Sequence, residues 1–189
     1  HMNNVIKHGA IALTAMVLMS GCARFGDADR PENETASRVD LDRFMGRWYV
    51  IAHIPTFIET KAYNAVEAYE RRDADTIDTT FSFNKGGFDG KLKTYTPVAT
   101  VRPNTGDAIW GMQFVWPFKA EYRVIWVDDA YGVTVIGRNK RDYVWIMARE
   151  PVLDAGMRAE IDQFLAAQGY DLSKMREVPQ RWDDRGEAG

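Results

Sequence analysis

The chain has 189 residues, of which 46% are hydrophobic and 27% are charged, and its formal net charge is −3. This composition predicts a packed core, and the length suits a single all-β barrel domain. Because basic and acidic residues are interspersed, the chain lacks the lysine or arginine stripe that a phosphate backbone requires, which excludes nucleic acid as a partner.

Residues 1–21 have the pattern of a secretory signal peptide. His1 precedes a methionine and is interpreted as a cloning remnant, Lys7 supplies the cation, and an apolar run extends from Gly9 to Met19. A membrane-spanning helix needs about 20 residues, so this run is too short to span a bilayer. It matches the apolar core of an export signal.

Cys22 is the only cysteine of the chain. The small residues before it, in Leu18-Met19-Ser20-Gly21-Cys22, resemble the lipobox of bacterial lipoproteins, although Met19 stands where that family prefers leucine. The resemblance implies an acylated Cys22 anchored in a membrane and, because Ala23 follows in place of aspartate, sorting to the outer membrane. The alternative is a soluble export signal with a chance cysteine.

Residues 22–38 are rich in Asp, Glu, Arg and Asn and poor in apolar side chains. Such a segment buries too little apolar surface to fold alone, so we predict a flexible tether here. The folded domain is expected at 39–182, and the charged residues 183–189 are expected to form a disordered tail.

After Gly46 the chain contains eight short runs rich in β-branched and aromatic residues, separated by turn residues, which predicts an antiparallel meander. Their ranges are 47–54, 64–72, 76–84, 91–102, 107–116, 119–128, 132–138 and 143–149. Pro97 lies within the fourth run and requires a bulge or an edge position there, because proline has no N–H to donate. Between the first two runs, Phe57 and Ile58 are too apolar for a loop that only faces water.

Four of these runs direct apolar side chains to one side, which predicts either a packed core or the wall of a cavity. The shared phases comprise Ile77, Thr79, Phe81 and Phe83, then Trp110, Met112, Phe114 and Trp116, then Tyr122, Val124 and Trp126, and last Tyr143, Trp145 and Met147 with Arg149.

The opposite face of the last run is also apolar and needs a cover. Apolar side chains recur at helical spacing between Asp154, a predicted N-cap, and Gly169, so a helix is expected to pack on the outside of the sheet. Residues 174–178 are predicted to add a short edge strand.

The sequence offers few candidates for chemistry. Only His53 remains outside the leader and the His1 remnant, so a histidine metal site is not expected. We interpret His53 as a solvated histidine at the rim, with haem or bilin ligation as the alternative. Glu67 shares a strand phase with Tyr69; one phase places Glu67 in the interior with a raised pKa, and the other places it in water.

Four motifs in order resemble the lipocalin family, in particular its bacterial outer-membrane lipoprotein branch. They are Gly46-Arg47-Trp48-Tyr49, then Arg141-Asp142-Tyr143 with Arg141 where many members carry threonine, then Tyr143-Val144-Trp145-Ile146 with Arg149, and Gly169-Tyr170-Asp171. The resemblance implies an eight-stranded antiparallel up-and-down barrel with a C-terminal α-helix outside. It also implies that Trp48 closes the base with Arg149 across it, and that the 55–63 loop lies over the open mouth.

The family's members bind small hydrophobic molecules, and its bacterial branch is associated with fatty acids, lysophospholipids and envelope maintenance. We therefore expect a non-enzymatic lipid carrier without a cofactor, anchored in the outer membrane and facing the periplasm; a homodimer is left open. The alternatives are an enzyme that uses Glu67 on an apolar substrate, and a barrel filled by its own rings. The expected ligand-contacting residues are Phe57, Tyr69, Phe81, Trp110, Met112, Phe114, Tyr122, Trp126, Trp145 and Met147.

Overall fold

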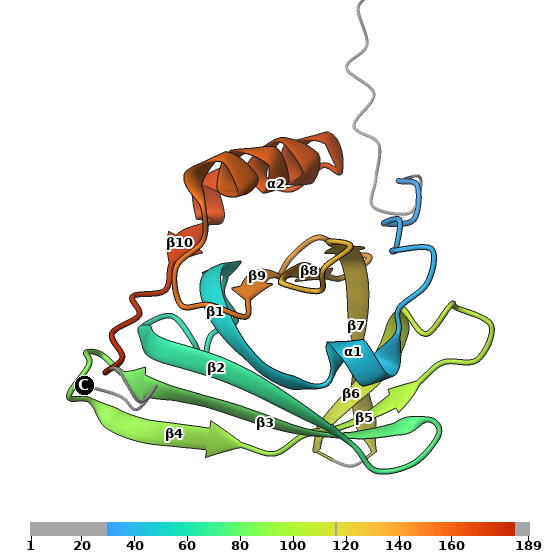
Figure 1. Cartoon of the computed structure of the whole chain (residues 1–189), viewed down its shortest axis with the longest axis horizontal. Coiled ribbons are helices and arrows are strands. Elements are labelled where there is room, and N and C mark those ends of the chain that lie inside the picture. The colour runs from blue at the N-terminus through green and yellow to red at the C-terminus, as the bar shows by residue number, and fades with distance from the viewer. Residues whose placement is uncertain (1–29, 116, 184–189) are drawn as a thin grey trace, which may run out of the picture. The chain divides into compact units, whose positions relative to one another are not determined.

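The structure is a computed structural model that describes residues 30–115 and 117–183 (Figure 1). The signal segment 1–21, Cys22 and residues 184–189 lie outside the described residues. The helices and strands all belong to one compact unit, Pro31–Gly189. Within the described residues, no helix combines the length and apolar character needed to cross a membrane.

Ten strands follow a short helix, α1 (Leu41–Phe44), and a longer helix, α2 (Ala155–Ala167), comes before the last strand. The strands are β1 (Gly46–Ile54), β2 (Ala62–Arg71), β3 (Thr76–Lys85), β4 (Lys91–Tyr95), β5 (Val98–Val101), β6 (Ile109–Val115), β7 (Phe118–Val127), β8 (Val133–Gly137), β9 (Val144–Ala148) and β10 (Arg176–Glu177).

The sheet closes into an antiparallel barrel because β9 pairs with β1. Strands β4 and β5 together form the predicted fourth strand, which is interrupted at Thr96 and Pro97. With these two counted as one, the predicted eight-stranded antiparallel barrel is confirmed. Strand β10 lies within the short edge strand predicted at 174–178. It pairs with β1 at Ala52 and His53.

The interruption at Pro97 changes the strand pairing of the barrel wall at one place. Strand β5 pairs with both β3 and β6, whereas β4 pairs with β3 alone among the described strands. Proline cannot donate a ladder hydrogen bond, so pairing changes at this residue. Within the described residues, the part of β6 after Gln113 therefore has no paired strand on the side of β5.

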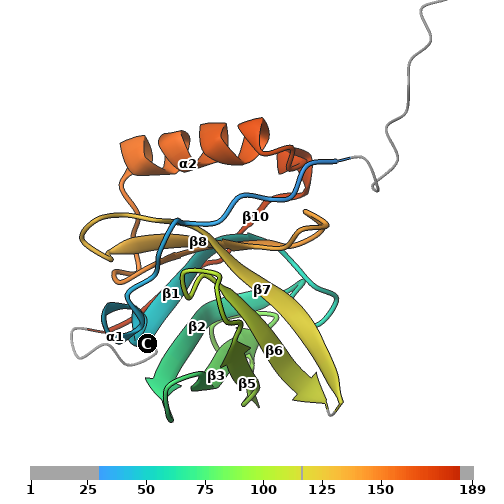
Figure 2. The ribbon, with the colours of Figure 1, turned by 90° about the vertical axis from the view of Figure 1, so that its right-hand side faces the viewer.

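Helix α2 packs on the outside of the barrel, as predicted (Figure 2). Asp154 caps its N-terminus by accepting hydrogen bonds from the N–H groups of Gly156 and Met157. Ile161 and Leu165 are fully buried against a cluster that contains the outward side chains of β9. Burial of each such side chain contributes about 1.5–3 kcal/mol to the stability of the fold. This burial holds the helix on the apolar outer face of the barrel.

The N-terminal segment 31–38 also packs on the barrel. The Asn33 side chain is fully buried; its Nδ2 donates to the Tyr170 hydroxyl at 2.8 Å and to the Arg138 carbonyl at 3.1 Å. The Ala36 N–H donates to the Val124 carbonyl, as in an added strand. The expectation of a tether as far as residue 38 was therefore wrong for 31–38, because a polar segment can be held by hydrogen bonds without an apolar core of its own.

Candidate functional site

The barrel is filled by side chains at the end where α1 lies. Trp48 is fully buried there and donates from Nε1 to the Phe44 carbonyl at 2.9 Å. The Arg149 guanidinium lies 3.7 Å from the centre of the Trp48 ring. It also donates to the carbonyls of Arg43, Phe44, Met45 and Arg47, so it ties α1 and the start of β1 across the base.

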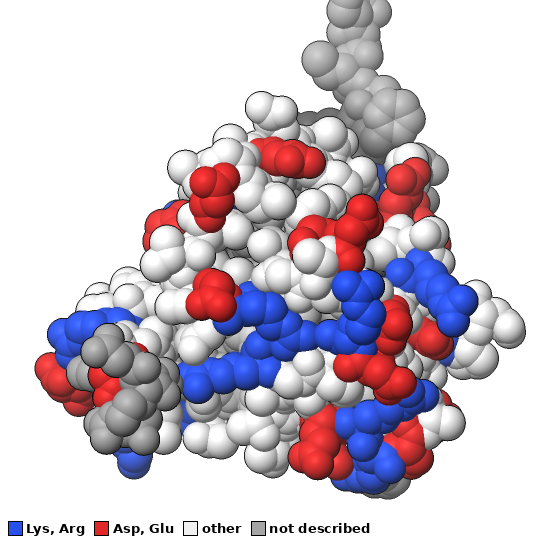
Figure 3. Space-filling view, viewed as in Figure 1, with Lys and Arg blue, Asp and Glu red and all other residues white. Residues whose placement is uncertain are grey.

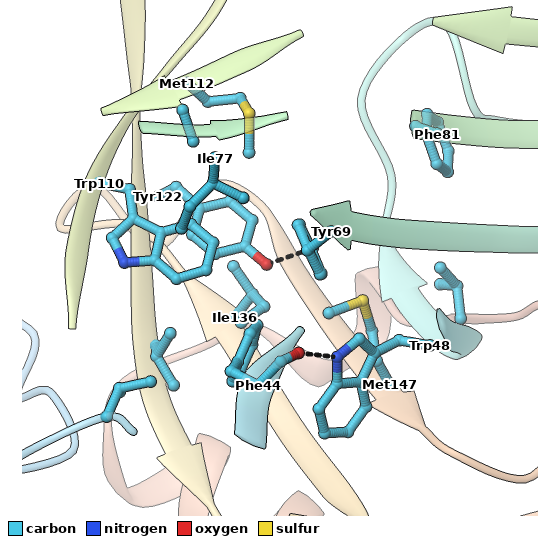
Figure 4. Close-up of a cluster of buried hydrophobic side chains, with 14 of the residues drawn as sticks. Phe44, Trp48, Tyr69, Ile77, Phe81, Trp110, Met112, Tyr122, Ile136 and Met147 are labelled. Atoms are coloured by element: carbon cyan, nitrogen blue, oxygen red, sulfur yellow. Dashed lines mark hydrogen bonds between the residues drawn. The ribbon is translucent and has the colours of Figure 1, made fainter. Parts of the chain in front are cut away.

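The aromatic side chains next to this base pack against one another (Figure 4). The Trp110 ring stacks on Tyr122 with centroids 4.9 Å apart, and Phe44 meets Trp110 edge-on at 5.4 Å. Tyr69 and Met147 lie in the same buried cluster. The half of the barrel next to α1 is therefore filled by side chains.

The other half of the barrel contains a cavity of about 520 Å³. Its lining comes from the 55–61 loop and from strands on all sides of the barrel: Thr56, Phe57, Ile58, Glu59, Glu67, Thr79, Phe81, Tyr95, Thr96, Pro97, Met112, Phe114, Ala120, Glu121, Tyr122, Arg138, Tyr143 and Trp145. Phe57 is 86% exposed at the rim of this cavity. Pro97 and Phe114 belong to the lining, and each lies just beyond the last residue pair of β5 with β6.

Six of the ten expected ligand-contacting residues line this cavity: Phe57, Phe81, Met112, Phe114, Tyr122 and Trp145. Tyr69, Trp110 and Met147 share the interior phase but lie below the cavity, in the filled half of the barrel. The sequence phase gives the side of a strand on which a residue lies, but not its depth along the barrel.

The predicted inward orientation of Trp126 was wrong. The register of β7 with β8 shifts between Val124 and Trp126, as at a β-bulge. An extra residue reverses the alternation, so Val124 points into the barrel core while Trp126 packs in the outer cluster beneath α2. No turn residue marks this bulge in the sequence.

Glu67 lies inside the barrel and lines the cavity, which decides between the two predicted phases. The Tyr69 hydroxyl donates to Glu67 Oε2, and the Tyr69 and Tyr122 hydroxyls are hydrogen bonded to each other (Figure 4). Burial raises the pKa of the Glu67 carboxyl to about 7; the bond from Tyr69 opposes this shift and the neighbouring Glu59 adds to it. The cavity thus has an acidic group in an otherwise mostly apolar wall.

Glu59 is a second buried acid in the lining and was not identified from the sequence. Its Oε1 accepts from Trp145 Nε1 at 2.9 Å, and its Oε2 accepts from the N–H and hydroxyl of Thr56. Burial raises the pKa of the Glu59 carboxyl, although these hydrogen bonds oppose the shift. These contacts hold the 55–61 loop against β9. The only sequence signal was an acidic residue next to the apolar pair Phe57 and Ile58.

Arg138 is the one arginine in the cavity lining, and sequence reasoning missed it together with Tyr95. Its guanidinium lies 5.1 Å from the centre of the Tyr143 ring and 3.5 Å from an Asp142 carboxyl oxygen. Within the described residues, the buried Arg138 Nε has no hydrogen-bond partner. A cation therefore lies at the wall of the cavity.

The interpretation of His53 as a solvated rim histidine was wrong. Its side chain is only 2% exposed, it is absent from the cavity lining, and burial lowers its pKa to about 4. His53 therefore does not support ligation of a haem or bilin in the cavity. Among the described residues, no three His, Cys, Asp or Glu side chains are grouped to hold a metal ion.

A barrel that is solid at one end and hollow at the other is a calyx, the architecture of proteins that hold one small molecule inside a β-barrel. A family model described as a lipocalin-like domain matches residues 39–180, and the chain belongs to this lipocalin family.

Curated relatives agree with this assignment, and a solved structure shares the fold. The chain is 27% identical to the outer membrane lipoprotein Blc of Escherichia coli (strain K12) over 174 residues, 89% of this chain and 94% of the relative. It is 26% identical to temperature-induced lipocalin-1 of Arabidopsis thaliana, over 80% of this chain and 85% of the relative. The structure of insecticyanin from Manduca sexta has a TM-score of 0.64 at 17% identity, covering 83% of this chain and 88% of that chain. This last similarity shows the fold alone.

Proposed function

We propose that the protein is an outer-membrane lipoprotein that binds a fatty acid or lysophospholipid and thereby stores or transports lipid in the cell envelope. The observation that carries this proposal is the mostly apolar cavity of about 520 Å³. Ligand pockets have volumes of about 300 Å³ or more. A barrel filled by its own rings is therefore the weaker alternative, since the rings fill only one half.

The lining supports an orientation for an amphiphilic ligand. Phe81, Met112 and Trp145 offer apolar surface to an acyl chain, whose burial contributes about 25 cal/mol per Å². Arg138 offers a cation for a carboxylate or phosphate headgroup. Because Glu67 repels an anion, the acyl chain would enter the cavity first.

Ligand binding is tested with a protein that begins at residue 23 and so keeps the whole compact unit. Native mass spectrometry and lipid extraction should detect a bound fatty acid or lysophospholipid, and they also show whether a homodimer forms. A Met112→Trp variant, which extends a ring into the cavity, should bind dodecanoic acid at least tenfold more weakly; Leu92→Trp, on the exposed outer surface, is its control. An empty protein that binds no lipid would end the proposal.

The anchor is a separate part of the proposal and is supported by the lipobox-like residues before Cys22 and by the outer-membrane relatives. Several acyl chains on Cys22 would hold the barrel at the membrane on the periplasmic side, because each buried methylene contributes about 0.8 kcal/mol. Mass spectrometry of the mature protein from a bacterial host should find a lipidated Cys22 at the N-terminus. Cys22→Ser should release the protein into the soluble fraction, whereas an unmodified Cys22 in membrane-bound protein would contradict the anchor.

A second candidate function is favoured by one observation, the position of Glu67 inside the cavity with a pKa of about 7. Such a carboxyl could exchange a proton with an apolar substrate near neutral pH. Turnover of a bound lipid that Glu67→Gln abolishes, with lipid affinity unchanged, would support an enzyme. Recovery of every bound lipid unaltered would support the carrier.

A further inference from the structure

The cavity floor contains polar groups that a plain acyl chain would not need. Glu67, Tyr122 and Thr79 all line the cavity, and Tyr69 lies directly below, where it connects Glu67 to Tyr122. Since Tyr69 donates to Glu67, Tyr122 must donate to Tyr69. When Glu67 is ionised, both phenol protons are used within the cluster, and the cluster can accept further hydrogen bonds on the Glu67 carboxylate and the Tyr122 oxygen.

The Thr79 hydroxyl is an independent sign of a ligand at this place. Thr79 is 3% exposed and belongs to the cavity lining, yet within the described residues its hydroxyl has no hydrogen-bond partner. A buried hydroxyl without a partner costs about 1–3 kcal/mol. Rotation of Thr79 about its Cα–Cβ bond would turn this buried hydroxyl toward the cavity, and a polar group of a bound molecule would then remove the cost.

Thr79 and Glu67 are close enough to share one ligand atom. In the pairing of β2 with β3, Thr79 lies opposite Tyr69, and Glu67 lies opposite Phe81, so Thr79 and Glu67 are diagonal neighbours on the same face. Such neighbours are about 7–8 Å apart at their Cα atoms, and both residues line the cavity. A hydroxyl placed between them could donate to Glu67 and accept from Thr79, because it is both donor and acceptor.

We propose that Glu67 and Thr79 form a hydroxyl-binding subsite at the cavity floor, which selects amphiphiles whose buried end carries a hydroxyl over those with a plain alkyl end. The inference rests on the proposed lipid-binding function and specifies its ligand class. A plain alkyl end would fill the cavity but leave Thr79 unpartnered. An anionic end would be repelled by Glu67.

The test compares dodecanoic acid with 12-hydroxydodecanoic acid by calorimetry at pH 8, where repulsion from Glu67 keeps the ligand carboxylate out of the cavity floor. The protein begins at residue 23 and is stripped of lipid before the titration. With the subsite, the hydroxy acid should bind about tenfold more tightly, as expected for one buried hydrogen bond to a charged group. Without it, the hydroxy acid should bind more weakly than the plain acid, because its hydroxyl would be buried without a partner.

Matched variants connect the preference to the two residues. Glu67→Gln and Thr79→Val should each lower the preference for the hydroxy acid by at least fivefold, and cooperative urea unfolding of each variant verifies that it is folded. Thr80→Val is the control, since Thr80 is on the same strand but exposed on the outer face. An unchanged preference in both floor variants would overturn the subsite.

The outcomes separate this inference from the function on which it rests. If both acids bind and the plain acid binds more tightly, the subsite is wrong and the lipid carrier stands. If neither acid binds, the subsite is wrong, and the lipid carrier fails as well if the protein also binds no lysophospholipid.

Discussion

At the scale of single residues, Arg149 is the side chain on which the closed end of the barrel depends. Its two Nη atoms donate to four backbone carbonyls between Arg43 and Arg47, and its Nε lies 3.3 Å from the Tyr131 carbonyl. These include the last carbonyls of α1, which have no partner inside so short a helix. The face on which α1 lies shows a band of Lys and Arg side chains with acidic side chains beside it (Figure 3).

We predict that Arg149→Lys lowers the free energy of unfolding by about 2–3 kcal/mol. A lysine ammonium cannot reproduce the planar fork that reaches several carbonyls while covering the Trp48 ring, and a hydrogen bond to a charged group contributes about 1.5–3 kcal/mol. Urea unfolding followed by fluorescence measures the change. Arg72→Lys is the control, because Arg72 forms only an exposed pair with Asp78 and its replacement should leave the unfolding midpoint unchanged.

Lipid affinity provides a second measurement on the same variant. Arg149 lies at the solid end and is absent from the cavity lining. The folded Arg149→Lys protein should therefore bind dodecanoic acid as the parent does. A free energy of unfolding of Arg149→Lys equal to that of the parent would show that the closed end of the barrel is held by packing and not by the guanidinium.

The sequence predicted single residues well where a motif fixes their place and poorly where local geometry intervenes. Trp48 lies in β1 and Arg149 directly follows β9, the two strands that close the barrel, and the Arg149 guanidinium covers the Trp48 ring. Trp126 was misplaced because a β-bulge reversed its side, and Glu59 was missed because its partners, Thr56 and Trp145, come together only in the fold.

At the scale of elements, three segments distant in sequence meet at Tyr170. Its hydroxyl accepts from Asn33 Nδ2 and lies 3.3 Å from the Arg138 N–H. It also lies where a side chain on Gly137 would be, since a Cβ there would come within 2.2 Å of the Tyr170 oxygen. The N-terminal segment, the end of β8 and the chain after α2 are thus joined through one hydroxyl.

We predict that Tyr170→Phe lowers the free energy of unfolding by about 1–2 kcal/mol. The phenylalanine keeps the ring but leaves the buried Asn33 amide with one partner fewer. Protease cleavage near residues 31–38 should become faster as that segment loses its attachment. Tyr63→Phe is the control: the Tyr63 ring packs on Phe88, and its hydroxyl has no hydrogen bond among the described residues. Equal stability of the two variants would contradict a role for the hydroxyl.

The elements themselves could largely be predicted from the sequence, because alternation of apolar residues, proline and capping residues act locally. The eight strands, the outer helix and the edge strand follow from such signals. The docking of 31–38 does not, because it depends on hydrogen bonds of Asn33 to residues more than a hundred positions away. A polar segment with a buried amide has the same composition as one in solvent.

At the scale of the whole molecule, two buried groups couple stability to pH in opposite directions. The pKa of His53 is lowered by burial from 6.5 to about 4, so the unfolded chain binds its proton more readily between these values. Its contribution to stability is complete above pH 6.5 and is lost as the pH falls toward 4, by about 3 kcal/mol in total. The pKa of Glu67 is raised by burial from 4.5 to about 7. Its contribution is complete below pH 4.5 and is lost as the pH rises through 7, also by about 3 kcal/mol.

The two effects should nearly cancel in the parent protein between pH 4.5 and 6.5, and single variants should expose each of them. In His53→Gln the Glu67 effect is no longer opposed by His53, so the free energy of unfolding, compared with that of a variant lacking both groups, should fall as the pH rises, by up to about 1.4 kcal/mol per pH unit. In Glu67→Gln the His53 effect is no longer opposed by Glu67, so the free energy of unfolding should rise with pH over the same range by the same comparison. Urea unfolding at half-unit pH steps measures both slopes.

The double variant His53→Gln, Glu67→Gln is the control for these slopes, because all other titrating groups are present in it. Its pH dependence should match that of the parent, since two opposite contributions have been removed together. Slopes of the same sign in the two single variants would show that one of these side chains is not buried as the structure has it. A bound lipid should change the pH dependence contributed by Glu67 and leave that of His53 unchanged, because of these two residues only Glu67 faces the cavity that the ligand would fill.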